Sequence, residues 1–262
     1  MDILTLFAKT VLFRPYVFAF LAAFLFAAIQ LIGWSRTWRF WMISWITAFV
    51  CEYSSTRTGV PFGWYFYNGS TVGKELYLSN VPFMDSVSFS FLLFAAYCVA
   101  LCLLLPPESS STSTRSPLVE LRFDPEARTS RPVFLTTALL FVLLDMVIDP
   151  VALRGDQWFL GKIYYYPEPG IHFGVPLANY VGWAVVGLTS LAIYLLLERR
   201  LPLHTFPPSV TPQLLPGVGL YYGVLAFNLG ITFWIGETLM AISGLVMHLP
   251  VLGALIVRLA PR

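Results

Sequence analysis

Residues 86–107 read SVSFSFLLFAAYCVALCLLLPP, without a single charged side chain. A second charge-free run occupies residues 17–34 and reads VFAFLAAFLFAAIQLIGW. A helix needs about 20 predominantly apolar residues to cross the hydrocarbon core of a bilayer. Helices also satisfy their own backbone hydrogen bonds, which lipid cannot do for them. The two runs therefore predict membrane-spanning helices.

The composition indicates the same class for the whole chain. Of its 262 residues, 57% are hydrophobic and only 11% are charged. A soluble domain carries roughly 25% charged residues, so this chain has too few charges to cover a water-facing surface. The net charge of +2 gives no reason to expect a nucleic-acid partner. The predicted fold class is an all-α, polytopic integral membrane protein.

The apolar runs predict about seven transmembrane helices in a single transmembrane domain over residues 1–262. The helices are expected at residues 17–34, 38–53, 83–105, 133–153, 175–197, 217–239 and 244–260. The second and the last of these segments are short for a span. Six spans are therefore the alternative.

One polar segment, residues 106–132, interrupts the apolar pattern. It begins with two prolines, continues through a Ser/Thr cluster at residues 109–114 and carries four arginines. With this segment, ten of the sixteen Lys and Arg residues fall on one side of the predicted bundle. The positive-inside rule therefore predicts a polar cytoplasmic loop at residues 106–132. Lys9 and Arg14, on the opposite side, count against this orientation.

Two loops on the other side, residues 54–82 and 154–174, resemble each other. Each loop comes after an acid near the end of one helix and contains an aromatic cluster. Each leads to a Val-Pro pair, and a polar residue stands three positions after the proline. The first set is Glu52, residues 62–67, Val81-Pro82 and Asp85; the second is Asp149, Trp158 with residues 164–166, Val175-Pro176 and Asn179. An aromatic belt at the membrane interface explains such rings in general, but not their clustering in two matching loops. We predict an internal repeat of helical hairpins.

Five acids lie within or at the ends of predicted helices, and counting the spans places them all toward one side: Glu52, Asp85, Asp145, Asp149 and Glu237. An ionisable group inside the membrane costs about 2.5–3.5 kcal/mol on insertion scales. Asp145 and Asp149 share one helix face. When two carboxyl groups lie so near each other, one tends to be protonated and the other ionised. That arrangement suits general-acid catalysis. Asp85 and Glu237 are explained equally well as interfacial or capping residues.

Two blocks of sequence resemble a known family. The first contains Glu52, GVPFGWYFY at residues 59–67 and Val81-Pro82; the second contains DMVIDP at residues 145–150, Trp158, Tyr165 and FGVPLANYVGW at residues 173–183. Together, over about residues 50–187, they resemble the membrane-embedded carotenoid hydratases. That family adds water to the ψ end of γ-carotene or of bisanhydrobacterioruberin.

The resemblance implies hydration of the terminal C=C of an acyclic carotenoid end group, the reaction of a carotenoid 1,2-hydratase. Proton transfer to carbon leaves a tertiary carbocation, so the site needs an acid, a surface that stabilises the cation and one water. No metal or redox cofactor is required. The acid is expected to be Asp145 or Asp149, with Glu52 and Asn179 in support. The aromatic rings expected at the substrate are Trp64, Tyr65, Tyr67, Trp158, Tyr165 and Trp183.

Two other functions fit the same residues. A carotenoid cyclase begins with the same protonation, but an internal alkene captures the cation instead of water. A proton-coupled transporter or a lipid-binding membrane protein would use the acids as a proton path, and the internal repeat fits that class as well. The expected partners are a carotenoid dissolved in the bilayer, the membrane itself and other enzymes of carotenoid biosynthesis. We expect the protein in the cytoplasmic (inner) membrane of a bacterium.

Overall fold

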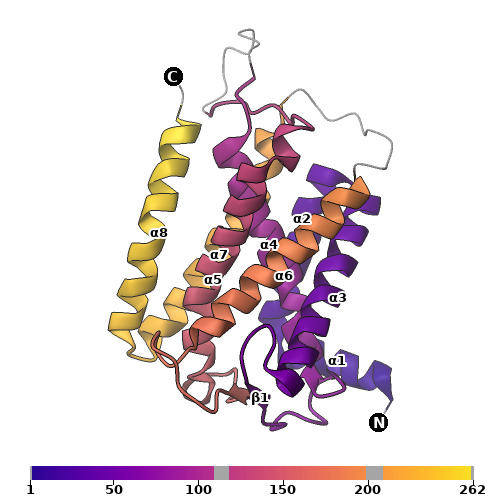
Figure 1. Ribbon diagram of the computed structural model, residues 1–262, viewed down its shortest axis with the longest axis vertical. Helices are drawn as coiled ribbons and strands as arrows, with labels where there is room; N and C mark the ends of the chain where they lie inside the picture. Colours follow the sequence, from indigo (N-terminus) through magenta and orange to yellow (C-terminus); the bar gives the residue numbers. More distant parts are fainter. Residues whose placement is uncertain (1, 109–117, 199–208, 261–262) are drawn as a thin grey trace.

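Figure 1 shows the computed structural model, which describes residues 2–108, 118–198 and 209–260. The α-helices are α1 (Ile3–Phe13), α2 (Pro15–Ile32), α3 (Trp34–Thr58), α4 (Phe83–Leu104), α5 (Arg131–Ala152), α6 (Leu177–Glu198), α7 (Thr211–Trp234) and α8 (Thr238–Leu259). Two short 3-10 turns, η1 (Ala127–Thr129) and η2 (Gly155–Gln157), and four two-residue strands complete the described elements.

The predicted all-α polytopic membrane fold is confirmed. Helices α2 to α8 match the seven predicted segments, and six of them, all except α3, are long and apolar enough to cross a membrane. Helix α3 has 25 residues but begins with Arg36 and Arg39 in its first turns, and it packs against α2, α4 and α6 inside the bundle. The described residues therefore form seven long bundle helices, of which six are long and apolar enough to cross a membrane.

Helix α4 lies at the centre of the bundle, where it packs against α3, α5 and α7 and also contacts α2 and α8. Its side chains are buried almost without interruption from Met84 to Cys102. A helix that is apolar on all sides is expected to be surrounded by protein or lipid, and here other helices surround it. The charge-free run at residues 86–107 thus forms the core of the molecule.

Helix α1 was not predicted, because its 11 residues are too few to span a bilayer. It lies across the lower end of the bundle in Figure 1, next to the chain's N-terminus. Ile3, Leu4 and Leu12 are between 72% and 81% exposed. A short helix with such an apolar surface suits the boundary between lipid and water.

The two aromatic loops meet at the same lower end of the bundle (Figure 1), which agrees with the predicted pair of matching hairpins. Strand β1 (Phe66–Tyr67) of the first loop pairs antiparallel with strand β4 (Tyr164–Tyr165) of the second, with Tyr67 opposite Tyr164. Strands β2 (Tyr77–Leu78) and β3 (Val81–Pro82) form a small hairpin that leads into α4. The loops are therefore one structural unit that closes this end of the bundle.

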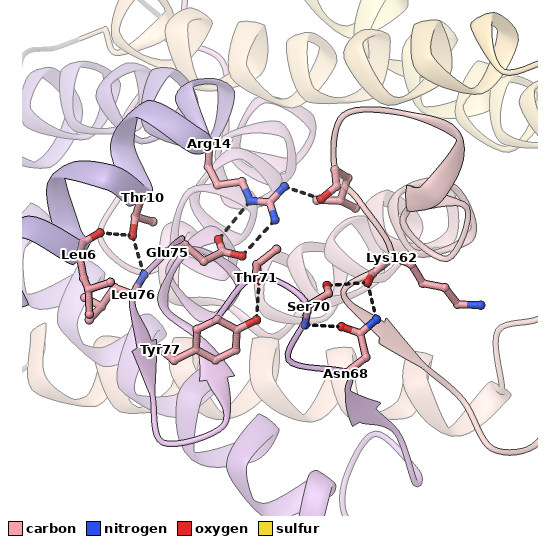
Figure 2. A network of polar contacts seen from close by, with 11 residues as sticks. Leu6, Thr10, Arg14, Asn68, Ser70, Thr71, Glu75, Leu76, Tyr77 and Lys162 are labelled. Carbon is pink, nitrogen blue, oxygen red and sulfur yellow. Dashed lines mark hydrogen bonds and ion pairs between the residues drawn. The ribbon is translucent and has the colours of Figure 1, made fainter. Parts of the chain in front are cut away.

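A buried ion pair fastens this unit to the α1–α2 junction (Figure 2). Arg14 donates to both carboxylate oxygens of Glu75, at 3.1 and 3.0 Å, and to the carbonyl oxygen of Leu160 at 2.6 Å. Thr10 of α1 accepts a hydrogen bond from the backbone of Leu76 at 2.7 Å. One arginine thus holds the first loop, the second loop and the start of α2 together.

The polar segment at residues 106–132 is described only in part. Its Ser/Thr cluster at residues 109–114 lies outside the described residues, as do Arg115, Arg199, Arg200 and Arg262. Where it is described, the segment runs along the opposite end of the bundle from the aromatic loops (Figure 1). It includes a backbone bridge between Pro107 and Leu121.

Candidate active site

A cavity of about 130 Å³ lies inside the bundle next to the two aromatic loops. Four of the five predicted acids line it: Glu52, Asp85, Asp145 and Asp149. Asn179 lines it as well. The fifth acid, Glu237, precedes α8 and forms an ion pair with Arg154 away from this cavity. The predicted gathering of acids at one side thus becomes a single carboxyl-lined chamber.

Helix ends bring these acids together. Glu52 lies near the end of α3, Asp85 lies in the first turn of α4, and Asp145 and Asp149 lie one turn apart near the end of α5. Asn179 occupies the first turn of α6. Because hairpins α3–α4 and α5–α6 both turn at the same end of the bundle, their four helix ends converge.

Asp149 is the best hydrogen-bonded of the acids. Its carboxylate accepts from the hydroxyl groups of Tyr164 and Tyr166, the latter at 2.6 Å, and from Asn179 Nδ2 at 3.0 Å. Three donors around one carboxyl group stabilise its ionised form. We call Asp149 with Asp145, Asn179, Tyr164 and Tyr166 the second centre, because it belongs to the second hairpin.

Asp145 differs from Asp149 in its surroundings. Its side chain is completely buried, and Asn179 Nδ2 donates to its Oδ2 at 2.7 Å. Its other oxygen, Oδ1, has no hydrogen-bond partner among the described residues. A buried oxygen without a partner is costly for an ionised carboxylate. Asp145 is therefore arranged as a neutral acid beside an ionised neighbour.

The first centre consists of Glu52, Tyr67 and Asp85 from the first hairpin. The Tyr67 hydroxyl lies 2.9 Å from Glu52 Oε1 and 2.6 Å from Asp85 Oδ2. Glu52 Oε2 is buried and has no partner among the described residues. One phenol thus bridges two acids here, whereas two phenols converge on one acid in the second centre.

The tyrosines of both centres keep their protons. Burial raises the pKa of Tyr67 well above 10, and the neighbouring Asp85 and Glu52 raise it further. Burial and Asp149 do the same to the pKa of Tyr164 and of Tyr166. All three phenols are therefore hydrogen-bond donors toward the acids.

Alternation along the two short strands decides which rings enter the cavity. Neighbouring side chains on a strand point to opposite sides. Tyr65 and Tyr67 line the cavity, whereas Trp64 between helix and strand is 51% exposed. Tyr164 and Tyr166 likewise line it, whereas Tyr165 is 42% exposed. The four inward tyrosines contact one another, with ring centroids 5.4–6.4 Å apart.

Of the six aromatic residues predicted at the substrate, four line the cavity: Tyr65, Tyr67, Trp158 and Trp183. Trp64 and Tyr165 do not, so they are not among the substrate contacts proposed below. Trp183 stacks on Phe89 of α4 with ring centroids 4.2 Å apart. Gly182 beside it allows Phe62 of the first loop to approach α6, since a Cβ atom there would lie 2.2 Å from the Phe62 ring.

Three polar residues were given no role from the sequence. The sequence indicates Tyr164 and Tyr166 only as part of an aromatic cluster, and it explains Asp85 equally well as a capping residue. For the tyrosines the available indication is the period of two in the run Tyr164-Tyr165-Tyr166, which separates inward from outward rings on a strand. For Asp85 the matching position of Asn179 in the repeat was the available indication.

The fold and the cavity define a polytopic membrane protein with buried acids at one end of its helical bundle. The sequence model of a family described as carotenoid biosynthesis protein matches residues 12–250. The chain therefore belongs to this family, and the predicted resemblance is confirmed.

A curated relative is the bisanhydrobacterioruberin hydratase of Haloarcula japonica. It is 31% identical over 199 residues, which are 74% of this chain and 56% of the relative. The chain thus matches little more than half the length of that relative. No solved structure matches the chain.

Proposed function

We propose that this protein adds water to the terminal C=C of an acyclic carotenoid end group, as a carotenoid 1,2-hydratase. Its family and the hydratase among its relatives support this reaction class. The observation that carries the proposal is the unequal pair Asp145 and Asp149: adjacent turns of one helix hold one acid with three donors and one with an unpartnered oxygen.

The reaction needs a proton at one carbon and a hydroxyl group at the next. The acid transfers its proton to the less substituted alkene carbon, whose π electrons form the new C–H bond. The tertiary carbon becomes cationic, a water oxygen bonds to it, and the water loses a proton to a carboxylate. The sum is alkene plus water giving a tertiary alcohol, and the site regains its protons.

Asp145 is the acid in this proposal and Asp149 the carboxylate that receives the proton of water. Asp145 is buried with one oxygen free of partners, which favours the neutral form. Asp149 is held by two phenols and an amide, which favours the ionised form. Asn179 donates to both carboxyl groups and so fixes their relative position.

The first centre contributes a negative charge and the tyrosine faces contribute π electron density. A phenol has a single hydrogen, so the two short contacts of Tyr67 need a second proton on Glu52 or Asp85. Asp85 lies in the first turn of α4, where the helix dipole favours a negative charge. The proton is therefore assigned to Glu52, and Asp85 stabilises the carbocation together with the rings of Tyr65 and Tyr67.

Expression in a host that accumulates lycopene or γ-carotene tests the proposal. Extracted pigments should gain the mass of one water for each modified end group, and Asp145→Asn should abolish the new pigment. A new pigment of unchanged mass would contradict hydration and identify a cyclase. An unchanged pigment profile with well-expressed, folded protein would contradict carotenoid chemistry and favour transport or lipid binding.

The same proposal places the protein in the cytoplasmic membrane with residues 106–132 on the cytoplasmic side. The excess of basic residues on that side supports this orientation. A cysteine introduced at exposed Glu126 should react with a membrane-impermeant maleimide only after the cells are opened. Labelling of intact cells would contradict the orientation. In that variant the native Cys51, Cys98 and Cys102 are replaced by alanine to remove background.

A further inference from the structure

The cavity has an apolar side that the chemistry above does not use. This side is lined by Val17 and Phe20 of α2, Phe91 of α4, and Val224 and Phe227 of α7. We call this side the aromatic arm. Two of the helices that line it, α2 and α7, pack against each other.

A continuous series of rings leads along this arm to the surface. Phe91, which is 3% exposed, contacts Phe20 at 5.9 Å between ring centroids, and Phe20 contacts Phe227 at 5.6 Å. Phe227 stacks on Tyr16 at 5.3 Å, and Tyr16 contacts Phe159 at 5.4 Å. Phe159 is 52% exposed. The arm therefore connects the bundle core with the outer surface through aromatic side chains alone.

The size of the cavity requires such a connection. A cavity of about 150 Å³ holds a molecule the size of benzene, and this one measures about 130 Å³. It accommodates a branched end group and a water, but not the long chain attached to that end group. The remainder of an elongated substrate must leave the cavity on an apolar side.

Other contacts border the cavity elsewhere. The two loops cover its polar end, and stacked Phe89 and Trp183 fill the space between α4 and α6. At the rim of the arm, Trp158 donates its indole N–H to the carbonyl of Val151 at 2.9 Å, and Arg14 binds the carbonyl of Leu160. Figure 2 shows the ion pair of this Arg14 with Glu75. Hydrogen bonds thus fix the backbone beside the arm, whereas the arm itself is lined by apolar side chains.

We propose that a linear polyene enters the protein from the bilayer between α2 and α7 and lies along the aromatic arm, with its end group at the acids. Conjugated chains and aromatic faces are both flat and apolar, so they pack without leaving a polar group unpaired. The position of the end group rests on the proposed hydration, but the binding of a polyene in the arm does not.

Polyene binding to full-length protein in lipid nanodiscs tests the proposal without any turnover. Lycopene is the probe, and its induced circular dichroism reports the bound form. Val224→Phe fills the arm and should weaken binding about tenfold, since overpacking a buried site costs that much.

Gly223→Phe is the matched control, because this neighbouring position is exposed and a Cβ atom there would meet no atom within 4 Å. It should leave lycopene binding unchanged. Should Val224→Phe fail to fold, Phe227→Leu keeps the volume nearly constant and should weaken binding about threefold through loss of ring contacts. Its control is Phe233→Leu on the lipid-facing side of α7, where the ring is 47% exposed.

Equal binding by Val224→Phe and Gly223→Phe, or by Phe227→Leu and Phe233→Leu, would overturn the aromatic arm as the polyene site. If hydration occurs while these variants behave alike, the arm is wrong and the proposed function stands. If lycopene binds in the arm but no acyclic carotenoid is hydrated, the proposed function is wrong and the arm stands.

Discussion

The two hairpins place similar residues at the same end of the bundle, yet their centres differ in hydrogen bonding. In the first centre Tyr67 bridges two acids, whereas in the second centre two tyrosines and an amide converge on Asp149. The repeated scaffold therefore fixes where polar groups lie, and the ratio of donors to acids at each centre fixes where protons lie. A repeated hairpin has in this way produced two unequal acid sites facing one cavity.

The loops also differ in how they are anchored. The first is held by Arg14 and Glu75, whose side chains are both 0% exposed. The second is tied to the start of α8 by Arg154 and Glu237, whose side chains are 22% and 32% exposed. A buried pair is fixed and costly to break, while a partly exposed pair contributes little. The ion pair of the first loop is thus the more costly of the two to break.

The largest effect is expected at the second centre. Asp145→Asn removes the proposed acid while keeping its shape, and hydration should fall by a factor of about 10²–10⁴, the contribution of a positioned acid. Pigment formation per folded protein measures it. The control is Asp156→Asn, which changes an exposed acid in the loop that follows α5 and should retain full activity. Equal activities of the two variants would refute the role of Asp145.

The next prediction compares the two ion pairs that anchor the loops, Arg14–Glu75 and Arg154–Glu237. Glu75→Gln leaves Arg14 buried without its counter-charge, and the free energy of unfolding should fall by about 3–5 kcal/mol. Glu237→Gln should cost less than about 1 kcal/mol, because its pair is partly exposed. Denaturant unfolding in detergent measures both variants. A larger loss for Glu237→Gln would reverse the order of the two ion pairs.

Within the first centre, the proposed charges predict unequal effects of equally small changes. Asp85→Asn removes a negative charge and a charged acceptor, a loss worth about 1.5–3 kcal/mol, and should slow hydration about ten- to hundredfold. Glu52→Gln replaces a neutral acid by a neutral amide and should slow it less than about threefold. Initial rates of hydration at saturating carotenoid measure both variants. The opposite order would place the proton on Asp85.

The smallest effects are expected when a single tyrosine hydroxyl group is removed from either centre. Tyr67→Phe removes the one donor that joins Glu52 to Asp85, and activity should fall about tenfold. Tyr164→Phe leaves Asp149 with Tyr166 and Asn179, so its effect should be only about threefold. The comparison uses the same rate assay with protein amounts matched by absorbance. Equal losses would mean that donor number does not distinguish the centres.

Much of this architecture could be predicted from the sequence, because apolar runs and helix ends are local features. The seven long helices and the shared side of the acids followed from them. Asp145 and Asp149 were singled out by their spacing of four, and Asn179 by its place after a proline. These are short-range relations that a single chain reveals without its fold.

What could not be predicted depends on contacts between distant segments. Arg14 and Glu75 are 61 residues apart, and nothing local marks them as partners. The aromatic arm combines α2 with α7, two helices whose cavity-facing rings show no pattern distinct from lipid-facing ones. The exclusion of Trp64 and Tyr165 from the cavity depends on the pairing of β1 with β4. The ion pair, the aromatic arm and the outward position of these two rings all depend on tertiary packing.

The central claim is that the second centre delivers a proton to carbon and then admits water. Reaction of an acyclic carotenoid with the purified protein in heavy water tests it most directly. The account predicts one carbon-bound deuterium per modified end group, next to a tertiary alcohol whose oxygen comes from the solvent. A product without carbon-bound deuterium, or with deuterium but no added oxygen, would contradict it.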